Sequence, residues 1–228
     1  MGKGEFLFLL QGLKWTVVLA VVSFLCGTVT GLAIALLRTS GYRAVERTTA
    51  GYIALFQGTP LLMQLFVVYY ALALYGLKID AWIAVAIAFT LHASAYLGEI
   101  WRGSIEAVPR GQVEAAKALS LNYFWRMKDI VLPQALRISL PATIGFLVQL
   151  IKGTSLASQF VLLTLTTSIA SAVSAYELTS VAKRVESDSF RSFEVYGVVT
   201  LMYLVMSWIV MNILNFISSR YISTYPVK

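Results

Sequence analysis

Long stretches without a charged residue are the feature that most restricts the fold of this chain. A transmembrane helix needs about 20 consecutive apolar residues; three stretches reach that length directly, and two more do so with charged residues at their ends. The 228 residues are 58% hydrophobic and only 13% charged. We therefore expect an all-α, polytopic membrane protein with one transmembrane domain over 1–228 and about five transmembrane helices, near 15–37, 48–77, 81–101, 136–152 and 195–219.

Basic residues gather on one side of these predicted spans. Arg38, Arg43 and Arg47 follow the first span, and a larger group lies between the third and fourth: Arg102, Arg110, Lys117, Arg126, Lys128 and Arg137. Loops rich in Lys and Arg stay in the cytoplasm. We therefore expect the N-terminus outside and the C-terminus in the cytoplasm. The net charge of +7 then reflects topology rather than nucleic-acid binding.

The stretch 153–176 is also free of charge and long enough to cross, but it is rich in Ser and Thr. Such composition favours contact with protein or a watery cavity over contact with lipid. We expect short re-entrant helices here, with a sixth span as the alternative.

The interval 102–135 is the longest charged part of the chain, and we expect it to form a cytoplasmic loop with short helices. Its sequence EAAKAL favours a helix, and Asn122 is suited to begin a second one. Two short helices joined by a tight turn would present Ala115, Ala116 and Leu121 to a groove in a partner. The alternative is an amphipathic linker on the membrane surface.

Several chemistries lack their sequence signals. The chain has no G-x-x-x-x-G-K-[ST] motif for ATP and no His, Cys and carboxylate pattern for a metal. Ser155 is not in a nucleophile elbow, so we do not expect an enzyme. For His92, the single histidine, we favour a hydrogen bond between helices over a proton relay.

A path for a polar solute is predicted near the end of the fourth span. Lys152 precedes a glycine, and Thr154 and Ser155 are suited to cap a following helix, so a broken helix here would direct N–H groups at a carboxylate. In the alternative, Lys152 simply extends to the outer surface.

Three further polar residues are candidates for the same path. Gln149 shares a helical face with Lys152, and Thr59 and Gln64 belong to the GTPLLMQ sequence of the second span. In the alternative reading, Thr59 and Pro60 only cap that span.

The segment from Glu114 to Pro133, EAAKALSLNYFWRMKDIVLP, resembles the EAA loop of permease subunits of bacterial ABC importers. Other segments are similar to the polar amino acid permeases within that group: FQGTPLLMQLFVVYYAL (56–72), YLGEIWRGSIEAVPRGQVEAA (96–116), LPQALRISLPA (132–142) and KGTSLAS (152–158). The family usually has Gly where this chain has Ser120, a position that suits positive φ.

The resemblance implies a subunit that moves polar amino acids across the bacterial inner membrane, driven by ATP hydrolysis elsewhere. Its expected partners are two ABC ATPase subunits that bind ATP and Mg, a second permease subunit, identical or paralogous, and an extracytoplasmic solute-binding protein. The residues expected to contact the ATPases are Glu114, Ala115, Ala116, Ala118, Ser120 and Leu121. The competing hypothesis is a stand-alone secondary transporter or channel.

The resemblance also bears on the substrate. Relatives linked to basic amino acids often carry acidic or amide residues where this chain has Gly145, Phe146 and Gly153. Their absence argues against arginine or lysine, although a second permease subunit can supply such groups.

Overall fold

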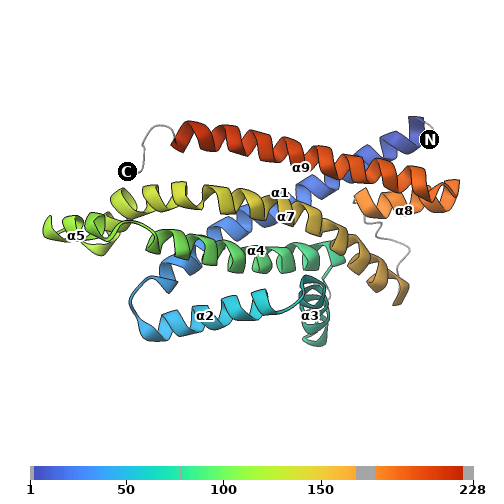
Figure 1. The fold of residues 1–228 in the computed structure, drawn as a ribbon. Helices are drawn as coiled ribbons and strands as arrows, with labels where there is room; N and C mark the ends of the chain where they lie inside the picture. The colour runs from blue at the N-terminus through green and yellow to red at the C-terminus, as the bar shows by residue number, and fades with distance from the viewer. Residues whose placement is uncertain (1–2, 78, 168–177, 223–228) are drawn as a thin grey trace.

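The computed structural model describes residues 3–77, 79–167 and 178–222, and these residues form helices and connections without a strand (Figure 1). The elements in chain order are α1 (Lys3–Arg38), α2 (Arg43–Gly58), α3 (Leu61–Leu74), α4 (Ala81–Glu106), α5 (Arg110–Ala118), α6 (Tyr123–Arg126), the π-helical segment η1 (Met127–Val131), α7 (Leu132–Thr167), α8 (Leu178–Ser189) and α9 (Ser192–Ile222). The expected all-α class is confirmed.

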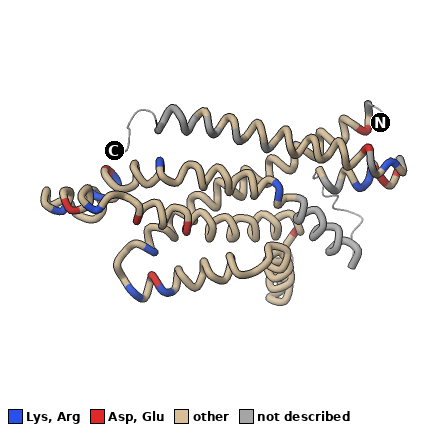
Figure 2. Tube along the Cα trace, viewed as in Figure 1, with Lys and Arg blue, Asp and Glu red and all other residues tan. Residues whose placement is uncertain are grey.

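The long helices have the length and composition of membrane spans. Within the described residues, Gly4–Arg38, Ala81–Glu106 and Tyr123–Thr154 each qualify alone, and α2 with α3 qualifies as a bent pair. The fifth predicted span lies within α9, whose apolar stretch is Glu194–Val210. Charged residues gather toward the two ends of the bundle and are sparse along its middle (Figure 2). This distribution fits a bilayer around the middle of the bundle.

The second predicted span, 48–77, does not form one straight helix. The chain turns by 110° between α2 and α3. Pro60 lacks a backbone N–H and disfavours helical backbone in the residue before it, so Thr59 takes the extended values φ −112° and ψ 139°. Because of this turn, the axis of α3 crosses the direction of the long helices in Figure 1.

The fourth predicted span, 136–152, is part of a much longer helix, and the break expected at Lys152 and Gly153 is wrong. Helix α7 continues through both residues to Thr167. Thr154 does not cap a new helix, because its Oγ1 donates a hydrogen bond to the carbonyl of Ile151 at 2.7 Å. Helix α7 also takes the place of the expected short helices over 153–167, and the rest of that predicted segment, 168–176, lies outside the described residues.

Helix α4 is the centre of the bundle, and α1 packs along it in the same direction (Figure 1). Three glycines bring these two helices close together. A Cβ atom on Gly27 would lie 2.5 Å from Ala93 Cβ, and one on Gly98 would lie 2.9 Å from Ile34 Cγ2. A Cβ on Gly31 would meet Leu97 Cβ at 3.0 Å. Small residues of this kind allow close packing in a bilayer, where lipid competes equally for apolar side chains.

A second cluster joins the first part of α1 to α8 and α9. Leu9, Leu178, Val181 and Val195 are buried together there. Thr16 Oγ1 also accepts a hydrogen bond from the Leu178 backbone N–H at 3.2 Å. This packing extends α1 well before the start of the predicted first span, 15–37.

We predict that Gly27→Ala destabilises the bundle while Gly51→Ala does not. The added methyl group at Gly27 overlaps Ala93, whereas Gly51 is exposed on α2 with open space around it. Overpacking of this kind costs about 1–3 kcal/mol. Thermal unfolding of the detergent-solubilised chain, followed by tryptophan fluorescence, should show a lower midpoint for the first variant alone. Equal midpoints would show that α1 and α4 are not in close contact.

Candidate functional site

The charged loop at 102–135 contains the predicted pair of short helices, α5 and α6. Helix α5 ends at Ala118, and Ser120, two residues later, has φ +56°. The Ser120 N–H bonds the carbonyl of Lys117 at 2.9 Å, and the Leu121 N–H bonds that of Ala116 at 3.1 Å. This is the Schellman arrangement, in which a left-handed residue closes the helix end. The turn therefore forms with serine in place of the usual glycine.

Asn122 begins the second helix as predicted. Its Oδ1 accepts a hydrogen bond from the Trp125 N–H at 3.0 Å. The exposed aromatic side chains of α6 are held by cations, with Lys128 Nζ 5.1 Å from the centre of the Trp125 ring and Arg126 Cζ 5.7 Å from that of Tyr123.

The face that this loop presents differs from the predicted one. Ala116 is only 1% exposed, so it belongs to the internal packing of the chain and is not available to a partner. Met127, which has no obvious core in the sequence, is also buried. Glu114, Ala115 and Ala118 are exposed, and Leu121 is half-buried. The exposed apolar residues are Ala115, Ala118, Leu119, Tyr123, Phe124 and Trp125, and we call this set the docking surface.

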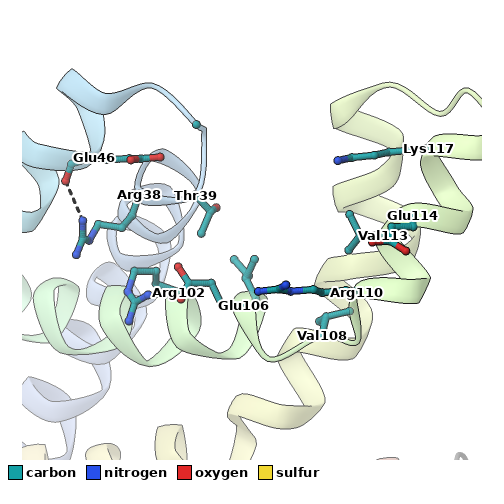
Figure 3. A pocket seen from close by; sticks show the side chains of 12 residues that line it. Arg38, Thr39, Glu46, Arg102, Glu106, Val108, Arg110, Val113, Glu114 and Lys117 are labelled. Carbon is teal, nitrogen blue, oxygen red and sulfur yellow. Dashed lines mark hydrogen bonds and ion pairs between the residues drawn. The ribbon is translucent and has the colours of Figure 1, made fainter.

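A charged cavity of about 540 Å³ lies between this loop and the ends of α1, α2 and α4 (Figure 3). Its wall includes Glu114 and Lys117 from α5, together with the side chains that face them from the bundle: Arg38, Glu46, Arg102 and Glu106. Apart from Glu114, none of these residues was a sequence candidate for the site.

Hydrogen bonds order the bundle side of this cavity. Arg102 contacts both Glu99 and Glu106, with a shortest N···O distance of 2.6 Å to each. Arg38 Nη1 donates to the backbone carbonyl of Glu46 at 3.0 Å, shown as the dashed line in Figure 3. The Arg102 contacts lie within the last turns of α4, and the Arg38 contact joins the end of α1 to the start of α2.

A second cavity, of about 430 Å³, lies within the helical bundle where α2 bends into α3. Eleven residues line this transmembrane cavity: Gln57, Gly58, Thr59, Pro60 and Leu61 from the bend, His92 and Tyr96 from α4, and Phe146, Gln149, Leu150 and Gly153 from α7. Asp, Glu, Lys and Arg are missing from this set of described residues.

Gln64 supports the bend from behind the cavity wall. It is 6% exposed, and its Nε2 lies 2.7 Å from the carbonyl oxygen of Phe56 and 2.9 Å from that of Thr59. Both carbonyls belong to the end of α2, where the helix leaves acceptors without partners. A buried acceptor without a partner costs several kcal/mol in an apolar medium, so this amide stabilises the bend.

The amide oxygen of Gln64 faces α4. Gln64 Oε1 lies 3.2 Å from His92 Nδ1, which confirms the prediction that His92 forms a hydrogen bond between helices. The His92 ring is 4.6 Å from that of Tyr96, and the Tyr96 and Phe146 rings stack at 5.4 Å. One wall of the cavity is therefore aromatic.

The predicted solute-path residues divide into two groups. Thr59 and Gln149 line the cavity, and Gln64 lies behind it. Lys152 is exposed on α7 and Thr154 is fully buried, and neither lines the cavity. The side chain of Ser155 lies outside the described residues. Because the α7 backbone is continuous, it leaves no free N–H groups at 152–155 for a carboxylate.

Sequence reasoning did not place His92, Tyr96 and Phe146 at a solute site. The sequence does offer a signal for two of them. His92 and Tyr96 are a polar and an aromatic residue within an apolar span, and their spacing of four residues puts them on one helical face.

The chain has relatives among known transport proteins. Residues 27–223 match the family described as binding-protein-dependent transport system inner membrane component. The probable amino-acid ABC transporter permease protein YckA of Bacillus subtilis is 32% identical over 95% of this chain and 90% of its own length. The octopine transport system permease protein OccM of Rhizobium radiobacter is 34% identical over 90% and 82%.

Solved structures agree. A chain from the crystal structure of an amino acid ABC transporter with histidines superposes with a TM-score of 0.78 at 30% identity, covering 93% of this chain and 94% of that chain. The inward-facing MetNI methionine ABC transporter gives a TM-score of 0.77 at 17% identity, with coverage of 97% and 100%, and so supports the fold alone. The chain therefore belongs to the family of binding-protein-dependent transport system inner membrane components.

Proposed function

We propose that this chain is the transmembrane permease subunit of an ABC importer for polar amino acids. The observation that carries this proposal is that one helix, α4, takes part in both sites. Its middle contributes His92 and Tyr96 to the transmembrane cavity, and its end contributes Arg102 and Glu106 to the charged cavity beside α5. In this proposal, α4, which is joined to α5 through residues 107–109, carries movement of α5 to the solute path. The names of the relatives given above support amino acids as the substrate class.

The complete importer contains, in this proposal, two ATPase subunits, a second permease subunit and an extracytoplasmic solute-binding protein. The ATPases bind ATP and Mg and receive the docking surface in a cleft. Leu119 is 75% exposed and Phe124 is 61% exposed, and large uncovered apolar groups at the polar end of a membrane protein favour such a partner.

The proposed orientation places this end in the cytoplasm. The α1–α2 connection and the α5 region carry Arg38, Arg43, Arg47, Arg110 and Lys117 at the same end of the bundle (Figure 2). The positive-inside rule then directs the N-terminus outside and the C-terminus to the cytoplasm.

A stand-alone secondary transporter or channel remains the competing function. The family match favours the importer, because its members are components of binding-protein-dependent systems.

We predict that mild detergent purification of this chain from its native membrane brings down an ATPase of separate sequence. ATP hydrolysis should accompany the complex and be missing from the isolated chain, because the chain has no P-loop motif. The measurement is subunit mass together with ATPase activity of each fraction. Nucleotide binding by the purified single chain would contradict the proposal.

We predict that Leu119→Asp weakens the hold on the ATPase while leaving the fold intact. The side chain is exposed, so the change removes only apolar contact and adds charge at the proposed cleft. The amount of copurified ATPase should fall about tenfold, since truncation of an interface anchor typically costs 1–2 kcal/mol or more.

Phe190→Asp is the matched control for Leu119→Asp. Phe190 is 89% exposed at the opposite end of the bundle and has φ +53°, which Asp tolerates. The Phe190→Asp variant should bring down as much ATPase as the unmodified chain does. An equal loss in both variants would mean that the docking surface is wrongly assigned.

We predict that Gln149→Leu slows amino acid uptake and that Lys152→Met does not. Gln149 lines the transmembrane cavity, and leucine removes its amide at similar volume, whereas Lys152 lies three residues along on α7 outside the cavity wall. A lost hydrogen bond to a polar solute should reduce uptake about tenfold. Uptake of labelled amino acid by proteoliposomes, normalised to assembled complex, measures this. A sharp loss in Lys152→Met would instead restore Lys152 to the solute path.

A further inference from the structure

Gln64 can face His92 in only one way. Its Nε2 lies within 3.0 Å of three oxygen atoms, the carbonyls of Phe56 and Thr59 and the Thr59 hydroxyl. The Thr59 hydroxyl hydrogen is already donated to the Leu55 carbonyl at 2.7 Å, so its oxygen is an acceptor toward Gln64. A reversed amide would direct its oxygen at three acceptors, which is unfavourable.

This orientation determines where His92 carries its proton. Gln64 Oε1 can only accept, so His92 Nδ1, at 3.2 Å, must donate. No carboxylate lies in the described cavity wall to stabilise an imidazolium, and a neutral ring whose Nδ1 donates carries its single proton on that atom. In that tautomer Nε2 carries a lone pair.

His92 Nε2 is also accessible. Among the described residues it has no hydrogen-bond partner, yet it is not one of the buried polar atoms that lack one, which are Ser23 Oγ, Thr28 Oγ1 and Arg38 Nε. His92 lines the transmembrane cavity, and its ring is packed against those of Tyr96 and Phe146 at centroid distances of 4.6 and 6.4 Å. The accessible atom thus belongs to a ring that lines the cavity and is held in place by two aromatic neighbours.

We propose that Gln64 fixes His92 in the Nδ1–H tautomer, so that Nε2 accepts a hydrogen bond from an N–H group of a neutral polar amino acid in the transmembrane cavity. His92 is then a specificity-determining residue, and Gln64 is the residue that positions it. The proposal rests on the proposed function in taking the cavity as the solute path.

The composition of the cavity wall sets the ligand class. Its described polar side chains include no Asp, Glu, Lys or Arg; they are the amides of Gln57 and Gln149, the hydroxyls of Thr59 and Tyr96, and the His92 ring. A cationic side chain would lose its hydration here without a counter-charge, which is costly in a low dielectric. A solute with an amide side chain and a paired ammonium and carboxylate meets both donors and acceptors. The N–H that reaches Nε2 belongs either to its side-chain amide or to its α-ammonium group.

The first test uses substitutions that separate the two ring nitrogens. In His92→Asn, the amide nitrogen can replace Nδ1 toward Gln64 but nothing replaces Nε2, whereas His92→Gln places an amide near the Nε2 position. Uptake of glutamine by proteoliposomes, normalised to assembled complex, should fall about tenfold in His92→Asn and recover partly in His92→Gln. Unchanged uptake in His92→Asn would overturn the proposal.

A comparison of glutamine with glutamate identifies the source of the N–H group. If the α-ammonium group is the donor, His92→Asn lowers uptake of both by the same factor. If the side-chain amide is the donor, the variant loses its preference for glutamine. A preference for glutamine that persists, with glutamine uptake as in the unmodified complex, counts against a role for Nε2.

The second test reads the tautomer directly. The chain has a single histidine, so subtracting the ¹⁵N spectrum of the ¹⁵N-histidine-labelled His92→Asn complex from that of the unmodified complex isolates His92. We expect a protonated Nδ1 and an unprotonated Nε2. A ring protonated on Nε2 or on both nitrogens would overturn the proposal.

The failures of the two proposals are distinguishable. If neither Gln149→Leu nor His92→Asn alters uptake, the cavity is not the solute path and the proposed function of this site fails. If Gln149→Leu slows uptake and His92→Asn does not, the path stands and only the role of His92 is wrong.

Discussion

The bend at Thr59 and Pro60 is the constraint on which the arrangement of the transmembrane site depends. A helix that breaks inside a bilayer leaves carbonyl groups that no water can reach, and these groups must find donors within the protein. Gln64 supplies the donor from the first turn of α3, at 2.7 Å from Phe56 O and 2.9 Å from Thr59 O. The amide oxygen of the same side chain, Oε1, faces His92 Nδ1 at 3.2 Å. One buried amide therefore stabilises the bend and orients the only histidine of the chain.

The bend matters because it separates α2 from α3 and creates the transmembrane cavity against α4 and α7. Tyr52 joins α2 to α4, because its hydroxyl lies 2.6 Å from Ser94 Oγ on α4. Trp101 joins α4 to α7, because its Nε1 donates a hydrogen bond to Thr143 Oγ1 on α7 at 3.1 Å. Helix α4 is thus tied to both walls by side-chain hydrogen bonds, which hold better in an apolar environment than in water.

Helix α4 also connects the transmembrane cavity to the end of the bundle that carries α5. It packs closely on α1 through glycines, and its last turns hold Arg102 between Glu99 and Glu106 beside α5. Close packing makes such a helix move as a unit rather than bend locally. In the proposed importer, this stiffness is what allows closure of distant ATPases to alter a neutral cavity within the membrane. The Schellman turn at Ser120, with φ +56°, sets the direction in which the chain leaves α5 toward α6.

The sequence by itself determined the features that depend on local composition. Long apolar runs define the membrane class, Asn122 begins α6 through a hydrogen bond three residues away, and Pro60 forces Thr59 out of the helix. Only the tertiary structure decided which helical faces meet. It buried Ala116, which local pattern offered to a partner, and it kept α7 continuous through Lys152. It also brought Gln64 to His92 across 28 positions. The physical reason is that helix formation depends on neighbours within about four residues, whereas packing depends on crossing angles and side-chain volumes contributed by distant segments.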